Sequence, residues 1–126
     1  MEYKVEIIDT SKELTPKERV MLKKHDAQCL DKIIVDDKEE SKVIVDLDYY
    51  AHLHIKNENS DDKEYEQYVF YDKNGLSYYT GSETVWREIN SIMEEMEGVE
   101  EDYKLVFYKR PSNKRDGKFF ITANII

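Results

Sequence analysis

The order of the segments that predict secondary structure constrains the fold more than any single motif does. Residues 82–98 predict one amphipathic helix, because Ser82 is a good N-cap, apolar residues recur at spacings of three and four, and Gly98 is a natural stop. The apolar stripe comprises Val85, Trp86, Ile89, Ile92, Met93 and Met96. Strand-like segments lie on both sides of this helix, so we expect a mainly β domain with the helix packed on the strands.

Before the helix, the strand signals differ in strength. Tyr3–Ile8 alternates weakly, and the β-branched runs Lys32–Val35 and Lys42–Val45 predict two short strands. Tyr49–Lys56 alternates clearly, which is typical of a half-buried antiparallel strand. Its apolar face consists of Ala51, Leu53 and Ile55, and its other face of Tyr50, His52, His54 and Lys56.

Two hairpins are predicted. Glu64–Tyr71 and Leu76–Thr80 flank an Asn-Gly pair, which is a strong hairpin signal. After the long helix, Tyr103–Arg110 and Lys118–Ile125 predict two strands joined by the polar loop 111–117.

A second helix is predicted near the N-terminus. Thr15 is a good N-cap, Pro16 occupies the first helical position, and Glu18 follows three residues after the cap. We expect this helix to run from Pro16 to about His25. Its apolar face is expected to consist of Val20 and Met21, with Leu14 as a staple.

The 126 residues fit one domain, 1–126, of the α+β class with mainly β structure. Several antiparallel strands with one helix before the last two are the order of an OB-fold, in which the helix plugs a small barrel. We therefore predict an OB-like barrel of five to six antiparallel strands, with an additional short N-terminal helix. Other α+β sheet folds fit the same order of elements.

Targeting signals are weak in this sequence. It contains no apolar run long enough to span a bilayer, and its first residues lack the basic-then-apolar layout of a secretory signal. The single cysteine, Cys29, excludes an internal disulfide and suits a reducing compartment. We therefore expect a cytoplasmic protein without a membrane partner.

Charge is divided unevenly along the chain. Six basic residues and one acid follow Tyr103, whereas the preceding residues carry the other 13 basic and 27 acidic groups. The net charge of −9 disfavours nucleic acid overall, but a local basic strip can still hold a phosphate chain.

Alternation in the last two strands predicts where this strip lies. Tyr108 and Arg110 share one face of the first strand, and Lys118 and Phe120 share one face of the second. Cations neutralise phosphates and aromatic rings stack unpaired bases, so such a face suits single-stranded nucleic acid. The expected phosphate-binding residues are Lys104, Arg110, Lys114, Arg115 and Lys118; the expected stacking residues are Tyr108 and Phe120, with Tyr50, Tyr68 and Tyr78 as additions from neighbouring strands.

The second half of the chain also carries an ordered series of motifs. It comprises Tyr68-Val-Phe-Tyr-Asp72, Gly75-Leu-Ser-Tyr78, Ser82-Glu-Thr-Val-Trp86, Tyr103-Lys-Leu-Val-Phe107, Pro111-Ser112-Asn113 and Gly117-Lys-Phe-Phe-Ile121. This series resembles the small single-stranded DNA-binding proteins of tailed phages of Gram-positive bacteria. The resemblance covers about residues 65–126 and implies an OB-like fold, coating of exposed single strands during replication, and tyrosine stacking. The acidic C-terminal tail with which many bacterial relatives recruit partners is absent here.

Catalytic and metal-binding patterns are sparse. His52 and His54 share a strand face but have no evident third metal ligand. His25 and Cys29 have no second Cys or His nearby to complete a zinc site. We therefore expect no metal and no cofactor. A buried thiol is the expected role of Cys29. No nucleophile, base and orienting partner occur together, which indicates a protein that is not an enzyme.

The sequence thus predicts a sequence-tolerant single-stranded DNA-binding protein that supports phage DNA replication or recombination. Its expected partners are single-stranded DNA and proteins of those pathways, and self-association is one way to offset the repulsion by its acidic body. The alternative is an acidic DNA-mimic or interaction protein that inhibits a host nucleic-acid enzyme. The acidic clusters Asp36–Glu40, Asp61-Asp62 and Glu94–Glu101 motivate this alternative.

Overall fold

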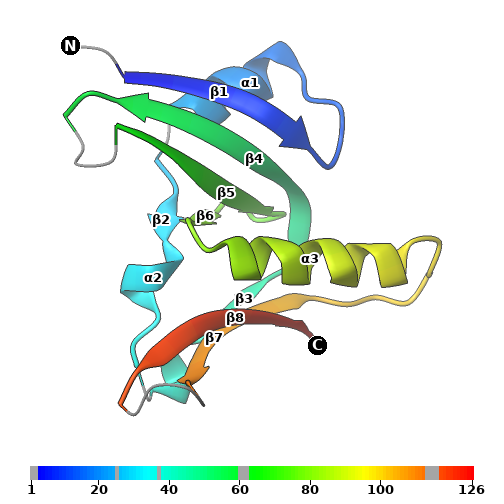
Figure 1. Ribbon diagram of the computed structural model, residues 1–126. Helices are drawn as coiled ribbons and strands as arrows, with labels where there is room; N and C mark the ends of the chain where they lie inside the picture. Colours follow the sequence, from blue (N-terminus) through cyan, green and yellow to red (C-terminus); the bar gives the residue numbers. More distant parts are fainter. Residues whose placement is uncertain (1–2, 25, 37, 60–62, 113–116) are drawn as a thin grey trace.

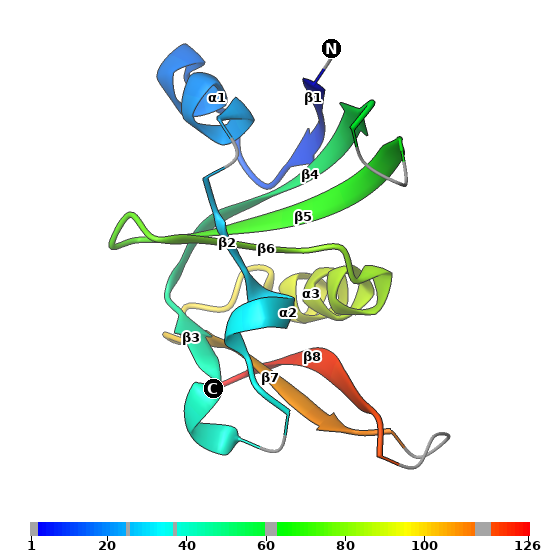
Figure 2. The same ribbon diagram turned by 90° about the vertical axis from the view of Figure 1, so that its left-hand side faces the viewer.

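The strands form two sheets on either side of the long helix α3 (Glu83–Met96), as Figures 1 and 2 show. The computed structural model describes residues 3–24, 26–36, 38–59, 63–112 and 117–126. The larger sheet has the order β1-β4-β5-β6-β2, and the smaller has the order β3-β7-β8. This mainly β architecture with three α-helices among the described residues agrees with the predicted fold class at that level.

The five-stranded sheet is built around β4 (Leu47–Asn57), which pairs antiparallel with β1 (Tyr3–Thr10) and with β5 (Glu64–Asp72). β5 in turn pairs antiparallel with β6 (Ser77–Thr80), and β2 (Gln28–Cys29) adds a short parallel edge. The alternation predicted for β4 is confirmed, because its odd-numbered residues from Tyr49 to Ile55 are buried against the side of the sheet opposite α3.

The turn between β5 and β6 confirms the predicted Asn-Gly hairpin. Gly75 has a φ of 88°, a conformation that residues with a Cβ rarely adopt. The Asp72 carboxylate accepts hydrogen bonds from the backbone N–H of Asn74 at 2.7 Å and of Asp46 at 3.0 Å. The same carboxylate therefore fixes both the turn and a neighbouring segment of chain.

That neighbouring segment is where the chain changes sheets. β3 (Val43–Val45) pairs with β7 (Leu105–Pro111), whereas β4, which begins two residues later, pairs with β5. Asp46 lies between them, and its carbonyl also accepts a hydrogen bond from the backbone N–H of Lys73 at 2.9 Å. β8 (Phe119–Ile125) completes the small sheet as the antiparallel partner of β7.

The helix α3 fills the space between the two sheets. Ser82 caps it as predicted, accepting a hydrogen bond from the N–H of Val85 at 3.2 Å. Val85 and Ile89 are fully buried and pack with Phe70 of the large sheet and Phe107 of the small one. The predicted role of the apolar stripe as core is confirmed for these two residues, and Trp86, Ile92 and Met93 pack at the margin of the same cluster. Met96, the last residue of the predicted stripe, is half-buried and does not belong to the cluster.

The predicted closed antiparallel barrel is wrong. Its strands lie in two separate sheets, and one pair, β2 with β6, is parallel. Closure would need a further strand beside β8, but Glu88 of α3 takes that place: its carboxylate accepts hydrogen bonds from the Ala123 N–H at 3.2 Å and from the Thr122 hydroxyl at 2.7 Å. A side chain of α3 thus accepts hydrogen bonds from the edge of β8 that a neighbouring strand would accept in a barrel.

The N-terminal helix α1 (Pro16–Lys23) begins as predicted, with a capping box between Thr15 and Glu18. It lies on the side of the large sheet away from α3 (Figure 2). The predicted apolar face is wrong, because Val20 and Met21 are 57% and 45% exposed. Leu22 instead packs into the sheet beside Leu14, the predicted staple.

One predicted strand is also wrong. The run Lys32–Val35 overlaps α2 (Leu30–Ile33), whose end is marked by a hydrogen bond from the Ile34 N–H to the Leu30 carbonyl. Leu30 and Ile34 lie four residues apart, so a helical turn buries both in the core between the sheets, which a strand would also do at that spacing. A short 3₁₀ turn, η1 (Glu39–Ser41), then leads into β3.

Candidate nucleic-acid interface

The hairpin β7–β8 brings three of the predicted site residues together. Arg110 lies opposite Phe120, and Tyr108 lies opposite Thr122, so these side chains share one face of the small sheet. Leu105 and Phe107 occupy the other face and are fully buried against α3 and the large sheet. The predicted inner positions Leu105, Phe107, Ile121 and Ala123 are confirmed as buried, whereas Val106 and Thr122, predicted on the other face, are buried as well. We call the face that bears Ile44, Val106, Tyr108, Arg110 and Phe120 the outer face.

Arg110 and Phe120 form a cation–π pair on the outer face. The guanidinium carbon lies 4.9 Å from the centre of the ring. Both rings of the predicted site, those of Tyr108 and Phe120, are half-buried rather than enclosed, whereas Arg110 is exposed. A half-buried ring is held in place by its inner edge and still presents a surface on which a base can stack.

A groove of about 650 Å³ lies beside these residues. Its floor includes Val106 and Tyr108, and the turn around η1 forms one wall. The last pair of the hairpin, Pro111 with Phe119, also lines it. The remaining lining residues are Lys38, Glu39, Glu40, Lys42, Lys109 and Ile126. Figure 2 shows the turn that contains η1 beside the C-terminal end of β8, below the small sheet.

The predicted cations differ in how the structure places them. Lys104 and Lys118 are exposed at the ends of the hairpin strands, where Lys104 pairs through its backbone with Ile126 and the Lys118 carbonyl accepts from Ser112. Among the described residues, neither they nor Arg110 forms an ion pair. Lys114 and Arg115 lie outside the described residues.

Lys109 has a structural role instead. Its ammonium donates to the Asp31 carbonyl at 2.9 Å and pairs with the Asp36 carboxylate at 3.3 Å. Only 16% of its side chain is exposed. Lys109 therefore ties β7 to the segment that leads into the η1 turn, and so holds the wall of the groove next to its floor.

The three additional tyrosines do not join this site. Tyr68 and Tyr78 are buried in the core between the sheets, and Tyr50 packs at its margin. Tyr68 stacks on Trp86 with ring centres 4.8 Å apart, and the Tyr50 ring meets the same indole edge-on at 5.4 Å. Burial raises the pKa of all three phenols, as expected for core tyrosines. The proposed base-stacking surface therefore consists of Tyr108 and Phe120.

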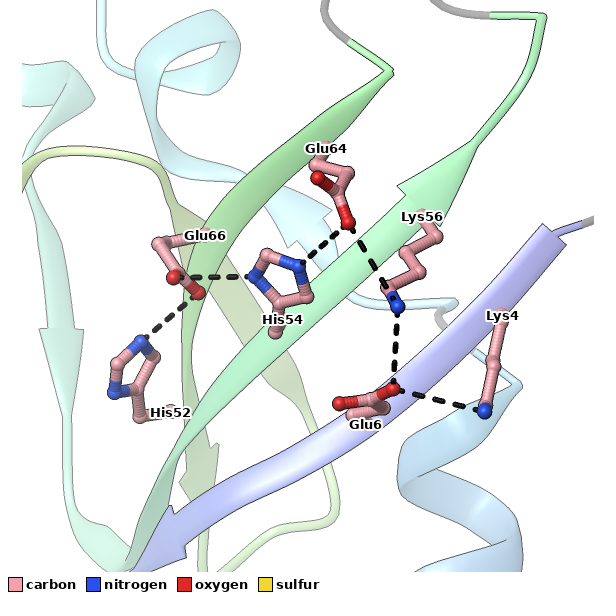
Figure 3. A network of polar contacts seen from close by, with 7 residues as sticks. All are labelled: Lys4, Glu6, His52, His54, Lys56, Glu64 and Glu66. Carbon is pink, nitrogen blue, oxygen red and sulfur yellow. Dashed lines mark hydrogen bonds and ion pairs between the residues drawn. The ribbon is translucent and has the colours of Figure 1, made fainter.

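The opposite end of the molecule carries a different polar surface, shown in Figure 3. Glu66 of β5 contacts both strand histidines: its carboxylate lies 3.1 Å from Nε2 of His52 and 3.2 Å from Nδ1 of His54. The hydrogen bond between His54 and Glu66 has the largest effect and raises the pKa of His54. Desolvation comes next and opposes this rise, and a hydrogen bond with Glu64 adds to it. Alternating acidic and basic groups extend this network across β4 to β1, through Lys56, Glu6 and Lys4.

This network does not form a metal centre. In the part of the chain that the structure describes, no group of three or more His, Cys, Asp or Glu side chains is placed to hold a metal ion. Cys29 is half-buried next to Tyr79, whose pKa is raised to about 12, mainly by burial and then by its hydrogen bond with the thiol. His25, the predicted neighbour of Cys29, lies outside the described residues.

Sequence reasoning missed the wall of the groove. In the sequence, Lys38 lies within the acidic cluster Asp36–Glu40 and Lys42 begins a predicted short strand, so neither is predicted to belong to the basic strip. They reach the outer face because Val43 pairs with Phe107, a contact between distant parts of the chain. No local pattern signals such a pairing.

Comparison with protein-family models, with curated proteins and with solved structures finds no match for this chain. None of the helices among the described residues is both long enough and apolar enough to cross a membrane.

Proposed function

We propose that the protein binds single-stranded DNA along the outer face of the small sheet, with little dependence on base sequence and without catalysing a reaction. The observation that carries this proposal is the pairing of Arg110 with Phe120 beside Tyr108, where Arg110 is exposed and both rings are half-buried. An unpaired strand offers phosphates to the cation and exposed base faces to the rings. In duplex DNA the base faces are stacked inside the helix and are not accessible to the rings.

Charge on this face supports the same proposal. Lys38, Lys104, Arg110 and Lys118 form no ion pair among the described residues, so their charge is not neutralised within that part of the chain. The acidic residues of the His–Glu network lie on the other sheet (Figure 3). Screening at physiological ionic strength acts over about 8 Å, which limits the repulsion from that distant surface.

We further infer that the fold is an opened variant of the OB arrangement. Support comes from the order of elements, with one helix before the last two strands, and from the chain crossing between sheets at Asp46. The resemblance of residues 65–126 to phage single-stranded DNA-binding proteins points the same way. A role in phage DNA replication or recombination, in the cytoplasm of a host cell, belongs to this proposal.

The test is a fluorescence-anisotropy titration with a labelled dT oligomer of about 12 nucleotides, the length range that one OB-type surface covers. We expect binding at about 50 mM salt that weakens at about 200 mM, with a linear dependence of log affinity on log salt. Arg110→Ala should reduce the magnitude of that slope by about 0.7, the value for one phosphate contact with a single strand.

Arg19→Ala is the matched control, because Arg19 is an exposed arginine of α1, on the far side of the large sheet. It should leave both affinity and slope unchanged. Absence of binding by the unmodified protein at low salt would reject the proposal, as would equal losses in the two arginine variants.

One observation favours a second candidate, an acidic interaction protein that occupies a nucleic-acid enzyme in place of DNA. The end of α3 and the segment after it carry six exposed acids without an ion pair among the described residues: Glu94, Glu95, Glu97, Glu100, Glu101 and Asp102. Negative charge at a helix C-terminus opposes the helix dipole, so helix stability does not account for it. A protein that fails to bind the dT oligomer but blocks DNA binding by a bacterial nuclease or polymerase would support this candidate.

A further inference from the structure

The groove beside the outer face has the size and lining of a site for one nucleotide. Its volume of about 650 Å³ lies within the usual range of small-ligand sites. Val106, Tyr108 and Ile126 supply apolar and aromatic surface, and the η1 turn supplies the charged groups. This inference rests on the proposed function, because it concerns the same strand of DNA at the same face.

The charged groups of the η1 wall divide into two kinds. Lys38 and Lys42 are exposed cations, of which Lys42 pairs at 3.8 Å with Glu39. Glu40 lines the groove and forms no ion pair among the described residues. Glu40 is exposed, so water hydrates it, but a carboxylate beside bound DNA still repels the phosphates. A hydrogen-bond donor of the ligand offsets this repulsion.

Unpaired bases differ in whether they supply such a donor. Cytosine and adenine present an exocyclic amino group, and guanine presents one beside its ring N–H. The one donor on the edge of thymine, its ring N3–H, lies between two carbonyl oxygens that repel a carboxylate. Glutamate accepting from the cytosine amino group is an established pairing between proteins and bases. Glu40 is therefore an acceptor that favours amino-bearing bases and disfavours thymine. Glu39 is a second acceptor, because its contact with Lys42 is long, at 3.8 Å, and leaves 89% of its side chain exposed.

We propose that this groove holds one unpaired base of bound DNA, stacked on Tyr108, and selects bases that carry an exocyclic amino group through Glu39 and Glu40. Lys38 and Lys42 bind the adjoining phosphates from the wall opposite the hairpin. The protein thus tolerates any sequence along most of the strand and has a modest preference at one position.

The test compares labelled dC and dT oligomers of equal length by anisotropy, at about pH 8, which is far above the pKa of a carboxylate. We expect the unmodified protein to bind dC about fivefold more tightly than dT, the ratio that one net hydrogen bond supplies. The double variant Glu39→Gln/Glu40→Gln should bring this ratio close to one, because a glutamine amide donates to thymine carbonyls as well as accepting from cytosine.

Removing two negative charges also strengthens binding to any DNA, so the ratio between the oligomers is the decisive quantity and not either affinity alone. The control Glu100→Gln/Glu101→Gln makes the same change of charge after the end of α3, at exposed positions, and should keep the fivefold ratio. Lys42→Gln should weaken both oligomers equally.

Equal binding of dC and dT by the unmodified protein would overturn the inference, as would a ratio that survives the Glu39/Glu40 substitutions. Both outcomes leave the proposed function standing, because binding itself is observed. Failure of both oligomers to bind at low salt is a different result, and it would reject the proposed function together with this inference.

Discussion

Glu88 offers the sharpest test of how the small sheet is attached to the rest of the molecule. Its carboxylate accepts two hydrogen bonds from β8, at 2.7 Å from the Thr122 hydroxyl and at 3.2 Å from the Ala123 N–H. Thr122 is only 2% exposed, so its hydroxyl has little access to water as a substitute partner. Glu88→Ala removes both bonds and leaves two donors of the edge strand without an acceptor.

The magnitude follows from these contacts. A hydrogen bond to a charged group contributes about 1.5–3 kcal/mol, and Glu88 is half-buried, so the lower end applies to each bond. We therefore expect Glu88→Ala to lower the free energy of unfolding by about 3 kcal/mol, a large part of a typical total of about 5–15 kcal/mol. Glu88→Gln keeps an acceptor for the Ala123 N–H and should cost about 1 kcal/mol.

Urea denaturation measures these differences, with Arg87→Ala as the control for an exposed side chain in the same turn of α3. Amide hydrogen exchange supplies a second readout, because the Ala123 N–H should lose protection in Glu88→Ala. A Glu88→Ala protein within about 0.5 kcal/mol of Arg87→Ala would refute the assignment of β8 to an edge held by α3.

Two other predictions concern the core and the histidine network. Phe107→Ala should lower the free energy of unfolding in urea by about 3–5 kcal/mol, because Phe107 is fully buried with its ring 5.0 Å from that of Phe70. Ile44→Ala on the outer face should lower it by less than about 1 kcal/mol. Similar losses of stability would contradict the assignment of inner and outer faces. Because the pKa of His54 is raised in the folded protein, its stabilising effect is fully present below the unfolded-state pKa of 6.5 and is lost as pH rises through the folded-state pKa. His54→Gln should therefore be less stable than the unmodified protein at about pH 5.5 and closer to it at about pH 8.5. Equal differences at both pH values would show that Glu66 and Glu64 do not stabilise the imidazolium.

Local chemistry explains which elements were predictable. Thr15 and Ser82 mark helix starts through contacts within a few residues, and Asn74-Gly75 specifies its turn through the positive φ of the glycine. The faces of β7 and β8 followed from alternation, which is why Tyr108, Arg110 and Phe120 were placed together correctly. These signals need no knowledge of distant segments.

The predictions that were wrong concern features that depend on contacts between distant segments of the chain. Leu30 and Ile34 bury equally well in a helical turn or a strand, and only their packing between the sheets decides. Val20 and Met21 were assigned to the core by their hydrophobicity, although the sheet beneath α1 contacts Leu22 instead. The two-sheet division and the η1 wall depend on which strands α3 and β7 meet, and neither partner is encoded nearby.

The crossing at Asp46 has a mechanical consequence. One uninterrupted stretch of backbone serves the small sheet up to Val45 and the large sheet from Leu47, and the Asp72 carboxylate and the Lys73 amide clamp the residue between them. The continuous backbone and these hydrogen bonds therefore fix the position of the small sheet relative to the large sheet. The Asp46 crossing therefore couples the outer face of the small sheet to the β5–β6 turn of the large one through continuous backbone and hydrogen bonds. In the proposed function, the affinity of the small sheet for DNA depends on this coupling to the large sheet.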